Sequence, residues 1–282
     1  MRRIRTARAM RVWAEERHAA GDRIGFVPTM GALHEGHLSL IRAARRSTGA
    51  VAVSIFVNPL QFGPSEDLVR YPRALAQDLG LCRKESVDVI FTPKVAELYP
   101  PGFETTVTVI QLTRRFEGLS RPGHFEGVAT VVTKLFNIVR PDRAFFGQKD
   151  YQQALVVRQL VKDLDLDTTI SVCPTVREAD GLALSSRNRF LSLPERRAAT
   201  ILYRALSAGR ALIQQGERSA RKVRQAMVRL IRSEPLSRLD YAAVADADML
   251  EEFHVVRGRA VLLLAVRIGK IRLIDNMVVT CH

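Results

Sequence analysis

The sequence predicts an α/β fold, a doubly wound, Rossmann-like parallel sheet with a smaller C-terminal α+β domain. Short apolar runs such as 51–57 alternate with amphipathic helical segments as far as Cys173, and uninterrupted apolar runs are typical of parallel strands buried on both faces. After Pro194 the order changes to two helices followed by three strand-like runs, which indicates a separate α+β unit. We therefore predict two domains, 1–187 and 188–282.

The first expected elements are an amphipathic helix through Met10, Val12 and Trp13 and a strand over 24–27. This strand should end at Pro28, because proline cannot donate to a ladder. Further strands are expected at 51–57, 87–91, 143–146 and 169–173, an alternating stretch at 105–110, and helices at 73–84, across 128–139 and from 151 to 164. The C-terminal unit should contain helices at 194–215 and 219–233 and strands at 239–245, 260–267 and 271–279.

Composition narrows the class of protein. The 282 residues are 47% apolar, which is enough for a large core. The net charge of +14 is typical of proteins that bind nucleic acid. This indication is weak here, because the arginines are spread along the chain rather than gathered in a tail. Cys82, Cys173 and Cys281 are odd in number and far apart, so neither a disulfide framework nor a metal set is expected.

We expect a cytoplasmic protein that binds neither nucleic acid nor membrane. The separated cysteines suit a reducing compartment, and no apolar run approaches the length of a membrane span. The N-terminus, 1–5, is basic but is not followed by an apolar signal core. An organelle presequence is the alternative for this segment.

The stretch 26–41 combines a strand, a glycine-containing turn and the start of a helix. Leu33, His37 and Leu40 fall on one helical face, which places His34 and His37 at the helix entrance. Free backbone N–H groups and the positive end of the helix dipole meet at such an entrance, so the stretch is typical of an anion site. A solvated turn and a zinc site are the alternatives, but the metalloprotease motif needs histidines four residues apart on one helix, and here the separation is three.

His34-Glu35-Gly36-His37 resembles the His-x-Gly-His (HxGH) signature of a nucleotidyltransferase superfamily, in which the histidines hold the phosphates of ATP. These four residues end a longer block that spans 28–37, and three further blocks follow it along the chain. They are Phe56-Val57-Asn58-Pro59-Leu60-Gln61-Phe62, Gly147-Gln148-Lys149-Asp150-Tyr151-Gln152-Gln153 and Leu184-Ser185-Ser186-Arg187-Asn188. In order and spacing the four blocks resemble the pantothenate synthetase family, whose members join pantoate to β-alanine.

Two positions depart from the usual pattern of this family. Leu184 stands where the family usually has methionine, and Gln148 stands where glutamate is common. Leucine conserves volume and apolarity, so packing against adenine should survive. Gln148 removes a negative charge beside Lys149, which could change the affinity for the nucleotide.

The resemblance implies two chemical steps. The pantoate carboxylate attacks the α-phosphorus of MgATP to give pantoyl adenylate and pyrophosphate, and the amine of β-alanine then displaces AMP. The catalytic, phosphate-binding set would be His34, His37, Lys149, Ser185, Ser186 and Arg187. The nucleotide would also contact Met30, Gly31, Ala32, Leu33, Glu35, Gly36, Gly147, Gln148, Asp150, Val176 and Leu184, with Gly147 and Asp150 at the ribose and Val176 and Leu184 at adenine.

Pantoate carries hydroxyl groups and a single charge, so amide side chains suit it. By resemblance these are Gln61 and Gln153, and Gln61 would also touch β-alanine. Asn58, Tyr71, Glu117 and Arg121 are further substrate-binding candidates, and Asp78 is the candidate ligand of Mg²⁺. No residue is an evident base for the amine of β-alanine.

The adenylate is a reactive anhydride, so water must be excluded until the amine arrives. The loop 117–124 and the domain 188–282 are expected to cover the site of the nucleotide-binding domain 1–187. The family also implies a homodimer.

Two other functions compete with this one. Another HxGH nucleotidyltransferase would adenylate a different small acid or a phosphopantetheine-like substrate, but the paired glutamine blocks and the chain length argue against it. An RNA-binding protein of the tRNA-synthetase type would explain the basic charge. The sequence has neither an anticodon-sized extension nor a basic face studded with aromatic residues.

Overall fold

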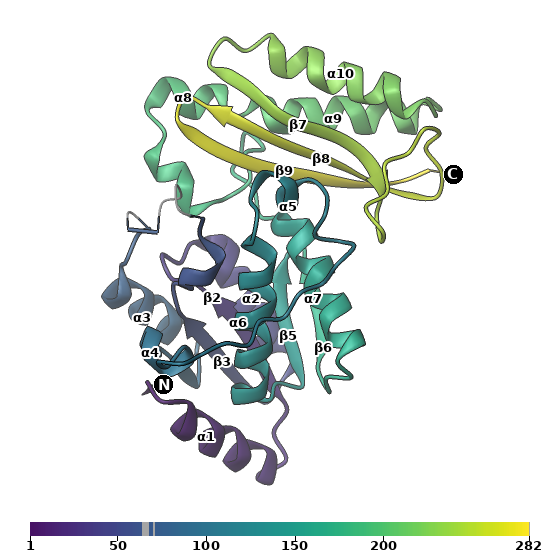
Figure 1. Ribbon diagram of the computed structural model, residues 1–282. Coiled ribbons are helices and arrows are strands. Elements are labelled where there is room, and N and C mark those ends of the chain that lie inside the picture. Colours follow the sequence, from purple (N-terminus) through teal and green to yellow (C-terminus); the bar gives the residue numbers. More distant parts are fainter. Residues whose placement is uncertain (64–67, 70, 282) are drawn as a thin grey trace. The chain divides into compact units, whose positions relative to one another are not determined.

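The computed structural model describes residues 1–63, 68–69 and 71–281 (Figure 1). Two compact units are present, one made of Met1–Gln148 and Gln152–Pro174 and the other of Lys149–Tyr151 and Thr175–His282. The first unit thus ends before Arg187, where the sequence places the domain boundary. The reason is that the segment leading to Arg187 is hydrogen-bonded within the second unit.

The described residues of the first unit form a six-stranded parallel sheet with the strand order β1-β4-β3-β2-β5-β6. Its strands are β1 (Arg2–Ile4), β2 (Ile24–Thr29), β3 (Ala50–Ile55), β4 (Val89–Phe91), β5 (Arg143–Gly147) and β6 (Thr169–Cys173). The helices that accompany it are α1 (Ala7–Ala19), α2 (Glu35–Ser47), α3 (Leu75–Lys84), α4 (Val95–Leu98), α5 (Glu117–Ser120), α6 (His124–Val139) and α7 (Tyr151–Asp163), with 3-10 turns η1 (Pro59–Gln61) and η2 (Gln148–Asp150). The predicted doubly wound sheet is confirmed.

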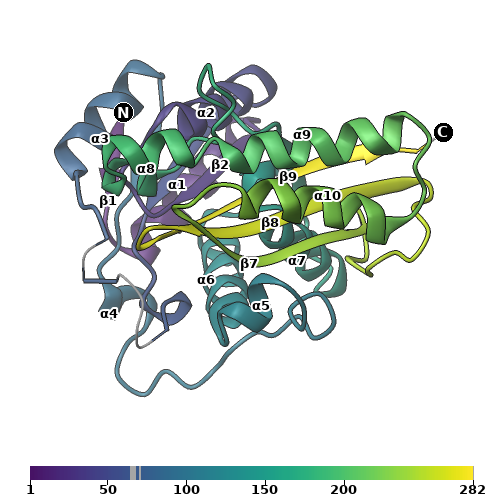
Figure 2. The ribbon, with the colours of Figure 1, turned by 90° about the horizontal axis from the view of Figure 1, so that it is seen from above.

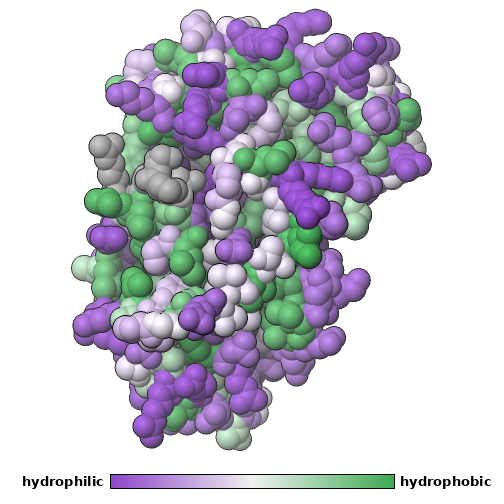
Figure 3. All heavy atoms as spheres, in the orientation of Figure 1, coloured by the Kyte–Doolittle hydropathy of each residue, from purple (hydrophilic) through white to green (hydrophobic). Residues whose placement is uncertain are grey.

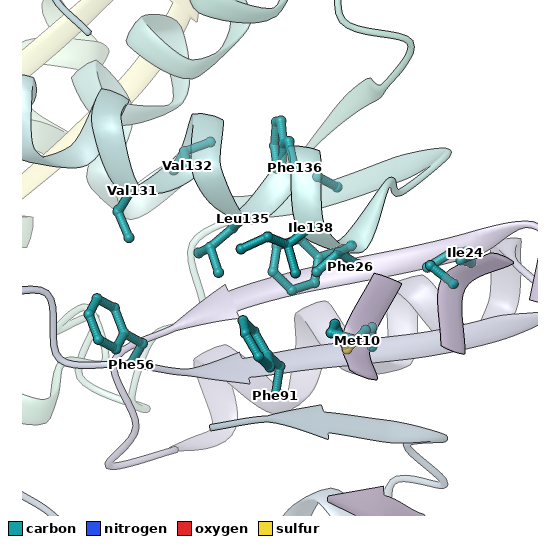
Figure 4. Packing of buried hydrophobic residues seen from close by; sticks show 14 of the residues in the cluster. Met10, Ile24, Phe26, Phe56, Phe91, Val131, Val132, Leu135, Phe136 and Ile138 are labelled. Atoms are coloured by element: carbon teal, nitrogen blue, oxygen red, sulfur yellow. The ribbon is translucent and has the colours of Figure 1, made fainter. Parts of the chain in front are cut away.

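Strand residues alternate between two apolar layers on opposite faces of this sheet. Phe26 and Phe91 face a layer formed with α1 and α6 (Figure 4), whereas Val27 and Ile90 face a layer formed with α2 and α3. The ring of Phe136 from α6 meets that of Phe26 edge-on, with centroids 6.3 Å apart. Because both faces are buried, the strands consist of nearly uninterrupted apolar residues.

The winding of the sheet reverses beside β2, which lies between β3 and β5. In doubly wound folds, ligands bind beyond the carboxyl ends of the strands at such a switch point. The segment 30–37 leaves the end of β2, and η2 leaves the end of β5. The loop with the two histidines therefore begins where this type of sheet binds its ligand.

The described residues of the second unit form a three-stranded antiparallel sheet in the order β7 (Ser237–Asp246), β8 (Arg259–Ile268), β9 (Ile271–Thr280). Figure 2 shows α9 (Ile201–Gln214) and α10 (Ala220–Arg232) running along it. Leu202, Met227 and Leu262 are fully buried in the core between these helices and the sheet. The turn η3 (Ser186–Phe190) and α8 (Leu193–Ala198) precede α9. The predicted order of helices followed by strands is confirmed.

Several local expectations are wrong. The first strand, β1, was missed. It has only three residues, too few to show the alternation of apolar and polar residues that predicts a strand, and two of them are exposed arginines. Pro28 lies inside β2, opposite Ser54 of β3. On the other side of β2, the pairing with β5 extends only to Phe26. Pro28 has no N–H group, and it is tolerated in the strand because no partner strand on that side requires one from it.

Two helices and one stretch also differ from expectation. Val12 is 44% exposed, because Met10, Trp13 and Ala14 form the buried face of α1 at the spacing of one helical stripe. The alternating stretch 105–110 is not a strand; its Val107 N–H donates to Thr130 Oγ1 of α6 at 2.9 Å instead of to a ladder. The helix expected over 194–215 is divided at 199–200 into α8 and α9.

Hydrophilic side chains cover much of the face drawn in Figure 3, and hydrophobic ones are scattered among them. Large exposed apolar side chains such as Leu119, Leu193 and Met249 come from separate elements of the chain, which is usual for single surface residues. Within 1–63, 68–69 and 71–281, no helix combines the length and the apolarity that a membrane crossing needs.

The thiol of Cys82 in α3 allows a test of the packing. Cys82 is fully buried, and burial raises the pKa of its thiol to about 12, with the charges of Asp78 and Glu85 acting in the same direction. Because the thiolate is the reactive form, Cys82 should resist iodoacetamide at pH 8 in the folded protein and react in guanidinium chloride. Peptide mass spectrometry would measure both states, with the half-buried Cys281 as the internal comparison. Equal modification of Cys82 in the two states would contradict this packing.

Candidate active site

The turn after β2 is fixed by side chains of other elements. Thr29 Oγ1 donates to a main-chain oxygen of β3 at 2.7 Å and accepts from Gly31 N at 3.1 Å. Asp78 of α3, only 1% exposed, accepts from Ala32 N at 2.9 Å and from Leu33 N at 2.8 Å. Ala32 has a φ of +52°, a conformation that costs free energy for a residue with a Cβ. The Asp78 carboxylate therefore stabilises a turn that Ala32 would otherwise avoid.

Two histidine rings cap the start of α2. His34 Nδ1 accepts from Gly36 N at 3.2 Å, and His37 Nδ1 accepts from His34 N at 3.3 Å. Together they form a reciprocal capping box, with ring centroids 4.2 Å apart. A neutral imidazole that accepts through Nδ1 carries its proton on Nε2. Both rings consequently present an Nε2–H donor at the positive end of the helix dipole.

The sequence analysis expected the backbone N–H groups at the helix entrance to be free, and the structure differs from this expectation. These groups are not all free for an anion, because those of His34 and Gly36 are bonded to the rings. The directed donors are the two Nε2–H groups instead. A Cβ on Gly36 would lie 2.9 Å from His34 Cε1 and 3.0 Å from His34 Nδ1, so a larger residue would displace the ring. The His-x-Gly-His spacing is thus the spacing of a two-ring cap.

The contacts of Asp78 give it a structural role that does not depend on a metal ion. Both of its carboxylate oxygens accept main-chain N–H groups, and the side chain is buried. Among the residues that the structure describes, no group of three or more His, Cys, Asp or Glu side chains is arranged to hold a metal ion. Asp78 is better described as the residue that holds the turn before His34.

Gln61 in η1 is oriented by Asn58. Asn58 Nδ2 donates to Gln61 Oε1 at 3.1 Å and to Gly127 O at 3.0 Å, while Asn58 Oδ1 accepts from Tyr99 Oη at 2.8 Å and from a main-chain N–H of η1 at 3.3 Å. Every hydrogen-bonding position of Asn58 is thereby used within the protein, which favours a positioning role over direct contact with a substrate. Gln61 Nε2 in turn lies 3.2 Å from Met30 Sδ, next to the histidine turn.

The main chain of Gln61 is held by His124, which the sequence analysis did not select. His124 Nδ1–H donates to Gln61 O at 2.9 Å, and His124 Nε2 accepts from Arg121 Nη1 at 3.0 Å. Arg121 Nη2 also donates to Gln61 O at 3.4 Å. A Cβ on Gly127 would lie 2.3 Å from Leu60 O, so α6 can approach η1 this closely only with glycine there. No local pattern reveals these long-range contacts.

The two glutamines at the start of α7 have different surroundings. Gln152 is buried, and its Nε2 donates to Leu112 O at 2.7 Å and to Arg115 O at 2.8 Å. Its Oε1 accepts from Glu117 N at 3.1 Å, so Gln152 fixes the loop that begins α5. The neighbouring Gln153 is half-buried on the same turn. The structure therefore gives Gln152 a structural role and leaves Gln153 as the substrate-binding candidate.

Two other candidates from the sequence lie in enclosed positions. Tyr71 is 7% exposed, and its ring meets Phe62 edge-on with centroids 5.9 Å apart. Glu117 is also buried, at the first position of α5. Both lie in the first unit.

The second unit contains its own group of predicted site residues. Leu184 N donates to Val176 O at 3.0 Å, so the two residues expected at adenine lie side by side on one hairpin. Ser185 caps η3 by accepting from Arg187 N at 3.2 Å. Ser186 and Arg187 follow as half-buried residues of η3.

Lys149 and Asp150 belong to this second unit as well. Lys149 Nζ lies 3.3 Å from Asp150 Oδ1, and the lysine side chain is 20% exposed. Asn276 Nδ2 of β9 donates to Lys149 O at 2.9 Å. Each unit thus brings a group of predicted residues together. In the first unit these are the histidine turn and Gln61, and in the second they are Lys149 and the hairpin 176–184, both of which are bonded to β9.

Comparison with known proteins gives one consistent result. The family model described as pantoate-beta-alanine ligase matches residues 2–278. Pantothenate synthetases of Moorella thermoacetica and Roseiflexus castenholzii are 55% and 56% identical over 278 residues, covering 99% of this chain and 98% and 99% of theirs.

Solved structures agree with these relatives. The pantothenate synthetase of Thermus thermophilus is 48% identical with a TM-score of 0.93, covering 98% of this chain and 99% of that one. The pantoate-beta-alanine ligase of Francisella tularensis, solved with beta-gamma ATP and beta-alanine, is 36% identical with a TM-score of 0.78 over 98% of this chain and 97% of that one. The chain therefore belongs to the pantoate-β-alanine ligase family, the family of the pantothenate synthetases.

Proposed function

We propose that this chain condenses (R)-pantoate with β-alanine to pantothenate, using ATP and passing through pantoyl adenylate, with release of AMP and pyrophosphate. The observation that carries the proposal is the pair of Nε2–H donors fixed at the entrance of α2, at the switch point of the sheet. Whole-chain similarity to pantothenate synthetases supports it, as does the complex of the Francisella relative with beta-gamma ATP and beta-alanine. The alternative, an HxGH enzyme for another acid, is not favoured by these matches.

In the first step an oxygen of the pantoate carboxylate attacks the α-phosphorus, and the bond from that phosphorus to the pyrophosphate oxygen breaks. Negative charge grows on the departing pyrophosphate, and donors fixed in advance stabilise it most effectively. We assign the Nε2–H groups of His34 and His37 to the phosphate oxygens, because the cap orients both rings before substrate binds. Lys149, Ser185, Ser186 and Arg187 are assigned to the same phosphates by their charges and hydroxyl donors.

The rest of the nucleotide is assigned to nearby backbone and apolar groups. Val176 and Leu184 are proposed to border adenine, since their main chains are bonded side by side. Gly147 and Asp150 are proposed to meet the ribose. The other proposed nucleotide contacts are Met30, Gly31, Ala32, Leu33, Glu35, Gly36 and Gln148.

In the second step the amine nitrogen of β-alanine attacks the acyl carbon of the adenylate, the bond from that carbon to the AMP oxygen breaks, and the nitrogen loses a proton. We assign no side chain as the acceptor of that proton. Gln61 is proposed to receive pantoate and to touch β-alanine, because Asn58 fixes its amide and His124 its main chain. Gln153 is the second proposed amide, and Tyr71, Glu117 and Arg121 are proposed to enclose this pocket.

Three further properties belong to the proposal. Mg²⁺ is proposed to accompany the ATP phosphates, with no ligand assigned in this chain. A homodimer follows from the family resemblance and would be tested by light scattering. A cytoplasmic location is supported by the free thiols of Cys82, Cys173 and Cys281, and cell fractionation would test it.

Exchange of labelled pyrophosphate into ATP tests the proposed reaction. The label should enter ATP when pantoate and MgATP are present without β-alanine, because adenylate formation is reversible. No exchange is expected with ATP alone. Exchange supported by another acid but not by pantoate would contradict the proposal and favour the other HxGH enzyme.

His34→Asn separates capping from catalysis. Asparagine is a good N-cap and can still accept from Gly36 N, but it offers no donor where the imidazole Nε2–H lies. The variant should stay close to the wild-type stability and lose on the order of 10²–10³ in exchange rate, whereas His34→Ala should in addition lose about 0.5–2 kcal/mol of unfolding free energy. Urea titration and the exchange assay measure the two effects. A wild-type exchange rate for His34→Asn would remove His34 from the phosphate set.

Asp78→Asn tests whether Asp78 holds the turn or a metal ion. The amide keeps one acceptor but turns an NH₂ group toward a main-chain N–H, so stability should fall by about 1.5–3 kcal/mol and the exchange rate should fall, while the Mg²⁺ concentration for half-maximal rate stays unchanged. The control is Asp88→Asn, since Asp88 Oδ2 accepts from Val51 N at 2.7 Å at the amino ends of the strands. That variant should lose stability but keep its exchange rate. A raised Mg²⁺ requirement with normal stability in Asp78→Asn would restore the metal role.

A further inference from the structure

Two adjacent polar residues, Asp275 and Asn276, are buried in the middle of β9, with exposures of 3% and 2%. They interrupt an otherwise largely apolar strand at the edge of the three-stranded sheet. Buried polar groups of this kind require partners. The partners here are the hairpin that leads to η3 and the main chain of Lys149.

Asp275 binds the hairpin through Arg177. Arg177 Nη1 lies 2.6 Å from Asp275 Oδ2 and Nη2 lies 2.9 Å from Asp275 Oδ1, a two-pronged ion pair. Arg177 Nη2 also donates to Asn276 O at 3.2 Å, and Nη1 donates to Gly181 O at 3.0 Å across the hairpin. The guanidinium carbon lies 4.9 Å from the centroid of the Tyr203 ring. Arg177 thus joins the base of the hairpin, its turn and β9.

The tip of the same hairpin is held independently. Arg196 of α8 donates to Glu178 Oε2 at 2.7 Å and to Asp180 Oδ2 at 2.8 Å. The Arg196 guanidinium lowers the pKa of Asp180, so this carboxylate is ionised at neutral pH. The hairpin is therefore fixed at its base by Arg177 and at its tip by Arg196, and the segment with Ser185 and Arg187 follows it in the chain.

Asn276 reaches the other predicted phosphate-binding segment. Its Nδ2 donates to Lys149 O at 2.9 Å, and Tyr151 Oη donates to Ala247 O at 2.7 Å. These two bonds explain why Lys149–Tyr151 belongs to the second unit although β5 and most of α7 belong to the first. β9 also contacts η3, which contains Ser186 and Arg187.

We propose that Asp275 and Asn276 are positioning residues of the nucleotide site, Asn276 by holding the main chain of Lys149 and Asp275 by holding, through Arg177, the hairpin that delivers Ser185, Ser186 and Arg187. The inference rests on the proposed function, because it takes these residues as the phosphate set. It makes β9 the common support of two segments that are far apart in the chain. Lys149, Ser185, Ser186 and Arg187 then all depend on β9 for their positions.

Charge balance agrees with this role. Burial raises the pKa of Asp275, and the Arg177 guanidinium, the Asn276 N–H and the positive charge of Lys149 oppose that rise. The two-pronged contact pairs the Asp275 carboxyl group with the Arg177 guanidinium, and the charge of Lys149 is close enough to act on the pKa of Asp275. Arg177 is thereby bonded within the protein, and its role in the proposal is to position the hairpin rather than to bind the nucleotide.

Two variants test the proposal without touching the phosphate set. Asn276→Asp keeps the shape but turns an oxygen toward Lys149 O, and Arg177→Lys keeps the charge but loses the two-pronged geometry. Asp240→Asn is the matched control, because Asp240 Oδ2 pairs with Arg272 Nε of β9 at 2.8 Å in the same sheet. The affinity for a non-hydrolysable ATP analogue is measured by calorimetry with MgCl₂ present, and folding is followed by near-UV circular dichroism.

Both test variants should be folded and should bind the analogue about 10–10²-fold more weakly, with KM for ATP raised and KM for pantoate unchanged, while Asp240→Asn matches the wild type. Unchanged affinity in the folded variants, or an equal rise of both KM values, would overturn the inference. Loss of folding in both would also overturn it, because the pair would then serve the fold alone. The binding measurement is independent of pantoate, so a wild type that binds the analogue but shows no pantoate-dependent exchange would count against the proposed function and not against the role of β9.

Discussion

The Nδ1 atoms of His34 and His37 accept main-chain N–H groups at 3.2 Å and 3.3 Å, and this bonding decides what the entrance of α2 can offer to a ligand. A helix start usually binds an anion through its own free N–H groups. Here the N–H groups of His34 and Gly36 are bonded to the rings, and each ring keeps its own N–H donor on Nε2. The result is a pair of neutral donors whose orientation is set before any ligand arrives, which is the condition for effective stabilisation of developing charge.

Within each unit, buried polar side chains act mainly on the backbone of the residues assigned to the proposed site. Asp78 holds the turn before His34, Asn58 and His124 hold Gln61, and Asn276 holds Lys149. The net contribution of a hydrogen bond to the free energy of unfolding is only about 0.5–1.5 kcal/mol, but a buried polar group that has lost its partner costs about 1–3 kcal/mol. The second figure is the expected cost of removing one of these side chains, and it explains why each supports one geometry of its loop.

Much of the fold and part of the site could be predicted from the sequence. Apolar runs gave the parallel strands because both sheet faces are buried, and the four sequence blocks selected the segments that the structure gathers within each unit. The spacing of His34 and His37 indicated a helix entrance, but it did not reveal that the rings would occupy N–H groups themselves. That feature depends on Gly36, whose missing Cβ leaves room for the ring of His34.

What the sequence missed depends on contacts between distant residues. Asp78 lies forty-odd positions from the turn that it stabilises, and His124 lies sixty-odd positions from Gln61, so no local period connects them. The pair Asp275-Asn276 lies within the expected strand 271–279, but its partners, Arg177 and Lys149, are more than ninety residues away. The short strand β1 was missed for a different reason, because its three residues are too few to show a periodic pattern.

The tautomers of the histidine rings test this account most directly. Long-range ¹H–¹⁵N spectra of histidine-labelled protein at neutral pH distinguish protonated from accepting ring nitrogens, and single His→Asn variants assign the signals. The account predicts the Nε2–H form for His34 and His37 and the opposite, Nδ1–H form for His124, whose Nδ1 donates to Gln61 O. Doubly protonated rings, or the Nδ1–H form at His34 or His37, would contradict it.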